Sequence, residues 1–200
     1  MPLFRAVPVS HASTRGEPQH PRESVRIPSN VPYVVDNLWE SLRHDHLPCR
    51  RHAVYASPTP ELALRCASPS GRNVALAVYE VVIDGPFLLA QLQVEDARLH
   101  RDIPAAQREL QKIMSALLAA PSQEKQVASL LFMPACSKDD WQHAVEHSPV
   151  AADFVQAAGA LSTFWGEVST EPTDSTGELF FQLGANASYR LAGPVPGRWS

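Results

Sequence analysis

Apolar residues occur along the whole chain in short runs, and the composition of these runs predicts several β-strands. Runs rich in Val, Leu, Ile, Phe and Tyr predict strands at 3–7, 52–56, 73–83, 87–93, 127–133, 178–183 and 189–191. The run at 87–93 follows an Asp-Gly-Pro turn, so we expect it to form a hairpin with the strand at 73–83. The run at 189–191 is expected to pair beside the late strand at 178–183.

Other segments place apolar residues three and four positions apart, which is the spacing of an amphipathic helix. This pattern predicts helices at 32–43, 60–67, 104–120, 137–147 and 149–158. Pro60 suits the first position of its helix, and Thr59 can cap that helix because its hydroxyl accepts a backbone N–H. Ser137 is expected to cap its own helix in the same way.

Strands and helices follow one another without regular alternation, which predicts an α+β fold. A length of 200 residues fits a single domain covering 1–200. Residues 10–31 are rich in Ser, Pro, Arg and His and show no periodicity, so we expect a mobile loop long enough to act as a lid or binding loop. The end of the chain, about 192–200, is expected to be loose.

The composition narrows the functional classes. With 17 Lys and Arg against 21 Asp and Glu, the net charge is −4, which disfavours non-specific binding to nucleic acid. No run of about 18 apolar residues is present and the N-terminus lacks the long apolar stretch of a secretory signal, so no membrane segment is expected. Three widely spaced cysteines are typical of reduced thiols in a cytoplasmic protein. His44 and His46 lie close together, but neither CxxC nor HExxH accompanies them, so no metal site is expected.

Polar side chains interrupt three of the apolar strand segments. Arg5 lies within LFRAV, Ser57 and Thr59 follow HAVYA, and Glu178 opens ELFFQL. A cation can neutralise a pyrophosphate, a hydroxyl can orient a carboxylate, and the carboxylate can stabilise the positive charge that develops as a glycosidic bond breaks. This set of residues therefore suits the cleavage of a dinucleotide. Simpler explanations stay open: a solvent-facing Arg5 on an edge strand, a Ser-Pro-Thr-Pro turn, and a surface charge at Glu178.

Three motifs, LFRAV, YASPTPELA and GELFF, resemble those of the Arg-Ser-Glu branch of the ADP-ribosyltransferase superfamily, which includes bacterial toxins and effectors. The motifs are short but spread over almost the whole chain, and Pro58 and Pro60 stand where the family usually has serines. The resemblance implies a mixed, antiparallel split β-sheet core with flanking helices. It also implies that NAD is the substrate, cleaved between nicotinamide and ribose, with ADP-ribose passing to an acceptor or to water.

The resemblance assigns roles to individual residues. Arg5 would bind the phosphate or ribose of NAD, Ser57 would position Glu178, and Glu178 would be catalytic. Tyr55 or Thr59 would line the nicotinamide pocket.

One position departs from a subset of the family. Members that modify arginine usually carry Glu or Gln two residues before the catalytic Glu, and that position is Thr176 here. The resemblance therefore does not support arginine as the target, and leaves another protein, a nucleic acid, a small molecule or water as the acceptor. Glu171, in a loop beside proline, and Glu80, expected to face solvent on the strand at 73–83, are weaker candidates for the catalytic carboxylate.

Two other functional classes stay open. A hydrolase could use Ser57 or Cys49 as nucleophile with His52 as base, although no G-x-S-x-G elbow is present. A non-enzymatic protein-interaction or immunity module is compatible with the proline-rich loops and mild acidity. We expect a cytoplasmic protein, delivered into another cell if it is a toxin, with a partner or immunity protein in that case.

Overall fold

A computed structural model describes residues 1–10, 16–28, 30–67, 75–173 and 177–195. The chain forms two compact units, each described by itself below. The sheet unit consists of Met1–Ser24, Asp45–Asp96 and Val168–Ser200, and the helical unit consists of Val25–His44 and Ala97–Glu167. The sequence predicts a single domain over 1–200, and each of the two compact units is assembled from segments that are separated in the sequence.

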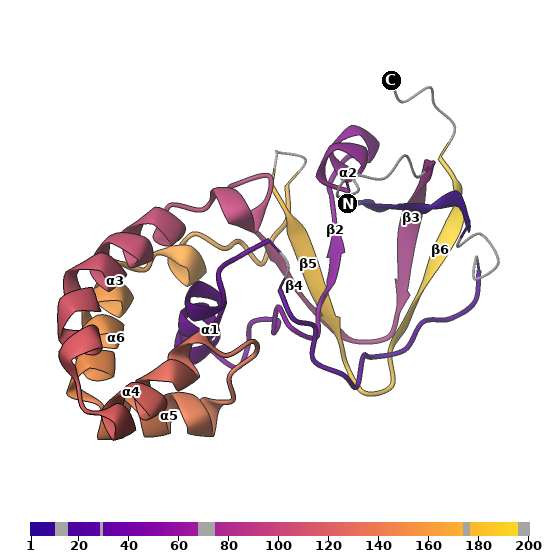
Figure 1. Ribbon diagram of the computed structural model, residues 1–200. Coiled ribbons are helices and arrows are strands. Elements are labelled where there is room, and N and C mark those ends of the chain that lie inside the picture. Colours follow the sequence, from indigo (N-terminus) through magenta and orange to yellow (C-terminus); the bar gives the residue numbers. More distant parts are fainter. Residues whose placement is uncertain (11–15, 29, 68–74, 174–176, 196–200) are drawn as a thin grey trace. The chain divides into compact units, whose positions relative to one another are not determined.

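The sheet unit contains two antiparallel three-stranded sheets (Figure 1). The first sheet has the order β1-β3-β6, with β1 at Leu3–Pro8, β3 at Leu76–Asp84 and β6 at Ser188–Pro194. The second has the order β2-β5-β4, with β2 at Val54–Ala56, β5 at Leu179–Leu183 and β4 at Phe87–Gln91. The helix α2 (Pro60–Cys66) also belongs to this unit.

The predicted strand partners are wrong in two cases. The strand β4 does not form a hairpin with β3 but pairs with β5, and β6 pairs with β3 instead of β5. Both β3 and β5 are the central strands of their sheets, so each has both edges occupied by other strands. The turn between β3 and β4 passes from one sheet to the other through Gly85, whose φ of +92° is readily adopted by glycine. At the end of the chain, β6 includes residues 192–194, and residues 196–200 of the predicted loose tail lie outside the described residues.

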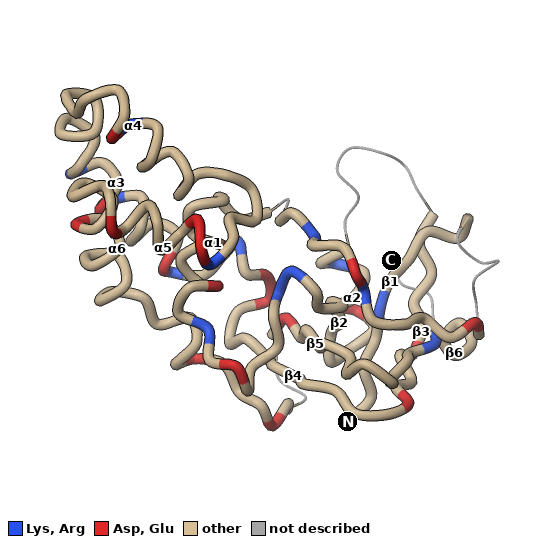
Figure 2. Tube along the Cα trace, turned by 90° about the horizontal axis from the view of Figure 1, so that it is seen from below, with Lys and Arg blue, Asp and Glu red and all other residues tan. Residues whose placement is uncertain are grey.

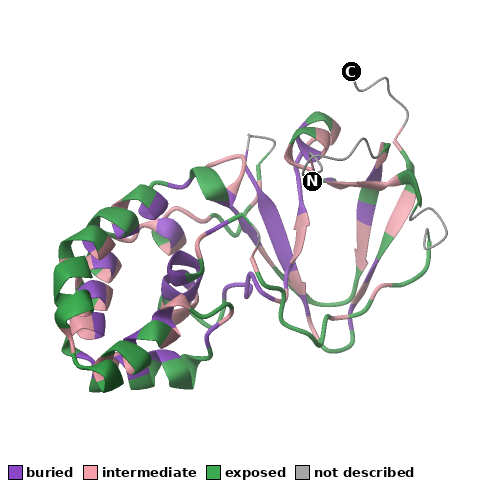
Figure 3. Ribbon diagram, in the orientation of Figure 1, coloured by how far each residue is buried: buried purple, intermediate pink, exposed green. Residues whose placement is uncertain are grey.

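The core of the sheet unit is apolar and draws on both sheets. Its buried members are Leu3, Ala56, Val81, Leu179, Phe181, Leu183, Ala187 and Tyr189. The strand β5 is buried along most of its length, as Figure 3 shows. Phe181 on this strand lies edge-to-face with Tyr189 at 5.6 Å between ring centroids. Truncating a fully buried phenylalanine such as Phe181 to alanine lowers the free energy of unfolding by about 3–5 kcal/mol. The packing of β5 therefore contributes to the stability of the sheet unit.

The helical unit contains five α-helices and three 3₁₀ turns among its described residues. The helices are α1 (Tyr33–Leu42), α3 (Asp102–Ala119), α4 (Ser122–Ala128), α5 (Lys138–His147) and α6 (Pro149–Leu161). The 3₁₀ turns are Ala97–Leu99, Ser129–Phe132 and Phe164–Gly166. The outward side of α3 is exposed over much of its length (Figure 3). The five predicted helices are therefore confirmed, four here and α2 in the sheet unit, with shifts of a few residues at their ends.

The strand predicted at 127–133 is wrong. These residues complete α4 and form the following 3₁₀ turn, with Ala128 and Leu131 buried three positions apart. A short, continuous apolar run cannot be distinguished from a buried helical segment by its periodicity. The mixture of helices with two antiparallel sheets confirms the α+β class. Among the helices of the described chain, none is both long and apolar enough to cross a membrane.

Candidate active site

Glu178 immediately precedes β5, and its main chain is hydrogen-bonded to the segment that follows β4. Its N–H donates to the carbonyl of Val94 at 2.9 Å, and its carbonyl accepts from the N–H of Leu92 at 2.9 Å. Gly177 packs so closely against Leu92 that an added Cβ would collide with the Leu92 carbonyl oxygen. The glycine in GELFF is therefore required by this close approach, and it fixes the place where the Glu178 side chain departs from the backbone.

The Glu178 carboxylate forms a buried ion pair with Arg50. The Arg50 Nη1 lies 3.5 Å from the Glu178 Oε1, and the two side chains are only 3% and 9% exposed. The guanidinium also lies over two aromatic rings, with its Cζ 5.4 Å from the centroid of Tyr55 and 5.5 Å from that of Phe180. Arginine favours such positions because its planar cation both stacks on rings and pairs with carboxylates.

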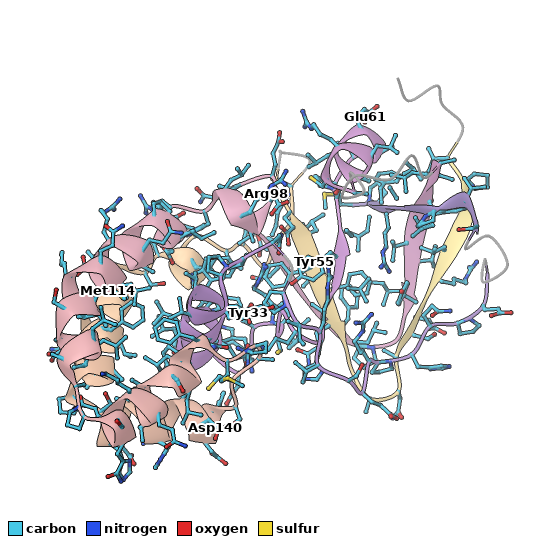
Figure 4. All side chains as sticks on the ribbon, in the orientation of Figure 1. Tyr33, Tyr55, Glu61, Arg98, Met114 and Asp140 are labelled. Atoms are coloured by element: carbon cyan, nitrogen blue, oxygen red, sulfur yellow. The ribbon has the colours of Figure 1, made fainter. Side chains whose placement is uncertain are left out.

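Tyr55 binds the main chain of Arg50. Its hydroxyl donates to the carbonyl oxygen of Arg50 at 3.0 Å, while its ring stacks with Phe180 at 6.1 Å between centroids. Figure 4 labels Tyr55 on β2. Arg50 was not assigned a role from the sequence, although Arg50 and Arg51 directly precede the apolar run at 52–56. Both arginines are buried, and a pair of cations leading into a buried strand is the signal that could have drawn attention to them.

Ser57 lies beside Glu178 in the strand register. Ala56 of β2 pairs with Leu179 of β5, so continuing this antiparallel register by one residue places Ser57 opposite Glu178. Ser57 is 4% exposed, and its N–H and carbonyl both bond to Phe4 of β1 at 2.8 Å. This pairing joins β1 to the end of β2. Ser57 therefore lies where β1, β2 and the start of β5 meet.

Arg5 follows Phe4 on β1, one of the two edge strands of its sheet, and is half-buried. Its Nη1 donates a hydrogen bond to the hydroxyl of Tyr189 at 2.9 Å. Among the residues that the structure describes, no carboxylate forms an ion pair with Arg5. A guanidinium bound only to a neutral hydroxyl keeps its capacity to pair with an anion.

Thr59 has a local structural task. Its Oγ1 accepts a hydrogen bond from the backbone N–H of Leu62 at 3.2 Å, which confirms it as the N-cap of α2. Pro60 occupies the first turn of that helix, also as predicted. The cap fixes the direction in which α2 leaves the Ser-Pro-Thr-Pro turn.

Acidic groups surround the end of α2 near Glu178. Burial, followed by the negative charges of Asp96, Glu178 and Glu95, raises the pKa of the Cys66 thiol to about 11 against the lowering effect of Arg65. The thiol donates to the carbonyl of Glu95 at 3.3 Å. Cys66 is therefore a neutral thiol at neutral pH, and Glu178 lies within electrostatic reach of it.

The other carboxylates considered from the sequence lie elsewhere. Glu80 on β3 is exposed, as expected for a solvent-facing strand residue. Glu171 is also exposed, and its N–H donates to the Oγ of Ser169 at 3.1 Å. Thr176 lies outside the described residues.

The residues considered for a hydrolase or a metal site show other contacts. The N–H of Cys49 donates to the Oε1 of Gln182 at 2.7 Å, and the Nδ1 of His52 lies 3.3 Å from the carbonyl oxygen of Arg22. His44 and His46 are exposed. Within the described part of the chain, no group of three or more His, Cys, Asp or Glu side chains is arranged to hold a metal ion.

A second buried carboxylate, Asp102, lies at the start of α3 in the helical unit. Its oxygens accept from the Nε1 of Trp39 at 2.9 Å, from the Oγ of Ser162 at 2.6 Å and from two backbone N–H groups, those of Thr163 and Phe164, each at 3.2 Å. These donors come from α1 and from the segment after α6. Asp102 therefore ties together three parts of the helical unit.

The pKa of Asp102 reflects these contacts. Burial alone would raise it, but the contact with His100 and the hydrogen bonds from Ser162, Thr163 and Trp39 hold the pKa of this carboxyl well below its usual range. Nothing in the sequence distinguishes Asp102, since an aspartate at the start of a helix is ordinary.

Charged residues of both signs are interspersed in both units, as the Cα trace in Figure 2 shows. Comparison of the chain with protein-family models, curated proteins and solved structures found no match.

Proposed function

We propose that the sheet unit has an ADP-ribosyltransferase-like split-sheet fold and cleaves the bond between nicotinamide and ribose in NAD. Glu178 is the catalytic carboxylate, and ADP-ribose passes to an acceptor or to water. The observation that carries this proposal is that the main chains of three distant motifs meet. Phe4, next to Arg5, pairs with Ser57, and the register of β2 with β5 places Ser57 opposite Glu178.

The arrangement supports a division of tasks. The Glu178 carboxylate holds a ribose hydroxyl and stabilises the cation that develops at the ribose as nicotinamide leaves. Ser57 occupies the position across from it and orients it. Arg5, half-buried and hydrogen-bonded to the Tyr189 hydroxyl, is suited to bind the pyrophosphate through its guanidinium.

The first experiment is to measure nicotinamide release from NAD by the purified protein, alone and with cell lysate. Release only with lysate identifies a transferase that needs its acceptor, and labelled NAD then marks that acceptor. Release without lysate identifies an NAD hydrolase. Absence of release in both cases, together with absence of NAD binding by calorimetry, would contradict the proposal.

The alternative function is partner binding without catalysis, as an interaction or immunity module, and the helical unit provides the observation that favours it. Met114 (labelled in Figure 4) and Leu118 are 37% and 68% exposed and lie one turn apart on α3, so they share a face of the helix. Exposed apolar side chains on one face are typical of protein-interaction surfaces. A protein that neither binds nor cleaves NAD, but whose partner binding is lost in Leu118→Glu, would have this function.

A further inference from the structure

Arg50 is the cation closest to Glu178 among the ion pairs that the structure describes, and it differs from Arg5 in its surroundings. Its side chain is 3% exposed, lies over the rings of Tyr55 and Phe180, and reaches the Glu178 carboxylate at 3.5 Å. The main chain of Arg50 is held in turn by the Tyr55 hydroxyl. The guanidinium is therefore fixed from three directions before any substrate arrives.

We propose that Arg50 is a positioning residue that holds the Glu178 carboxylate ionised and correctly oriented for NAD cleavage. This inference rests on the proposed function of the sheet unit, and it adds to that function a residue outside the three motifs. Arg50 does not bind the pyrophosphate, because its guanidinium is buried against two rings and a carboxylate. That task is left to Arg5, whose guanidinium contacts only a neutral hydroxyl among the described residues.

Burial explains why a cation is needed beside Glu178, whose side chain is 9% exposed. A buried carboxylate gains a proton more easily than one in water, because burial disfavours its ionised form. The guanidinium of Arg50 opposes this effect at close range.

The geometry favours positioning over a contribution to stability alone. A buried ion pair often contributes little net stability, because the cost of removing both charges from water offsets their attraction. The 3.5 Å contact joins the Nη1 of Arg50 to the Oε1 of Glu178, one of the two carboxylate oxygens. Lysine would keep the charge but lose the planar stacking on Tyr55 and Phe180.

The experiment compares wild type with Arg50→Met and Arg50→Lys in nicotinamide release across a pH series. In Arg50→Met we expect kcat to fall about 100-fold, the effect of a misplaced catalytic group, with the KM for NAD nearly unchanged. The acidic limb of its pH profile should move to higher pH, because the carboxylate without its cation protonates more easily. Arg50→Lys should keep the position of that limb and still lose kcat.

A matched control removes an ion pair outside the candidate site. Arg43, the C-cap of α1, pairs with Glu40 of that helix at 3.0 Å, with side chains 12% and 13% exposed. Arg43→Met should leave kcat and the pH profile unchanged. If Arg50→Met does not fold, Arg50→Lys carries the kinetic test, and the double variant Arg50→Met with Glu178→Gln, which removes both charges, should recover folding.

A titration separates failure of this inference from failure of the proposed function. Carbon-13 NMR of labelled glutamate carboxyls follows Glu178 directly, with Glu178→Gln identifying its signal. Glu178 should titrate at higher pH in Arg50→Met than in wild type. A wild-type protein that releases no nicotinamide overturns the proposed function. An unchanged Glu178 titration in Arg50→Met, or an Arg50→Lys variant with wild-type kcat, overturns the role of Arg50.

Discussion

The two units each bury a carboxylate, but they hold it by different means. Asp102 in the helical unit is 2% exposed and accepts hydrogen bonds from an indole, a hydroxyl and backbone N–H groups. Glu178 in the sheet unit is 8% exposed and faces the guanidinium of Arg50 as an ion pair at 3.5 Å. Burial alone therefore does not identify a functional carboxylate.

The difference lies in what each set of partners can do. Fixed N–H and O–H donors occupy both oxygens of Asp102, so little capacity remains there to bind a substrate hydroxyl. An ion pair with a buried cation keeps a carboxylate ionised, which the role proposed for Glu178 requires. Asp102 is thus suited to hold the helical unit together, whereas the charge of Glu178 is held by a neighbouring cation.

The largest expected effect is on turnover. Glu178→Gln should lower nicotinamide release about 1,000-fold, because the amide cannot supply the negative charge that stabilises the developing cation. The fold should stay intact, but the unfolding midpoint should fall, because the variant takes the carboxylate away from the buried Arg50 guanidinium. Wild-type turnover in this variant would remove Glu178 from the site. Glu178 and Asp102 would then no longer differ in function.

The second largest effect is expected on the free energy of unfolding, and it concerns Asp102. Asp102→Asn should lower the free energy of unfolding by about 3 kcal/mol, since it leaves donors such as Trp39 Nε1 poorly paired inside the helical unit. Urea unfolding measures this loss. An unfolding midpoint equal to that of wild type would show that the Asp102 network is not what holds the unit together.

A smaller effect is expected for substrate binding. Arg5→Ala should weaken NAD binding about tenfold, the value of one charge-assisted contact, while catalysis in the bound complex changes less. Calorimetry with NAD measures the change in Kd. An unchanged Kd would remove Arg5 from the proposed NAD site.

The smallest effect follows from the lowered pKa of Asp102. A carboxyl whose pKa is lower in the folded than in the unfolded state stabilises the protein above the unfolded value of about 4, and this stabilisation is lost as the pH falls below it. Wild type should therefore lose stability on acidification below about pH 4, and Asp102→Asn should lose less over the same range. Thermal unfolding at acidic pH measures both losses of stability. Equal losses in wild type and in Asp102→Asn would show that other carboxyls cause the effect.

Local features of the sequence determined the helices and their caps. Thr59 and Ser137 were predicted as N-caps and accept hydrogen bonds from Leu62 and Asp140, residues only three positions further along the chain. The apolar runs likewise predicted most strands, and the polar residues within them selected Arg5, Ser57 and Glu178. These predictions depend on neighbours in sequence, which the sequence displays directly.

The tertiary structure alone decided which strands pair and which charges meet. The choice of β5 as partner for β4 depends on which strand edges remain free after distant segments have assembled. Arg50 meets Glu178, and Trp39 meets Asp102, only because segments far apart in the chain pack together. Contacts of this kind depend on the burial and geometry of the assembled core, and no spacing along the sequence encodes them.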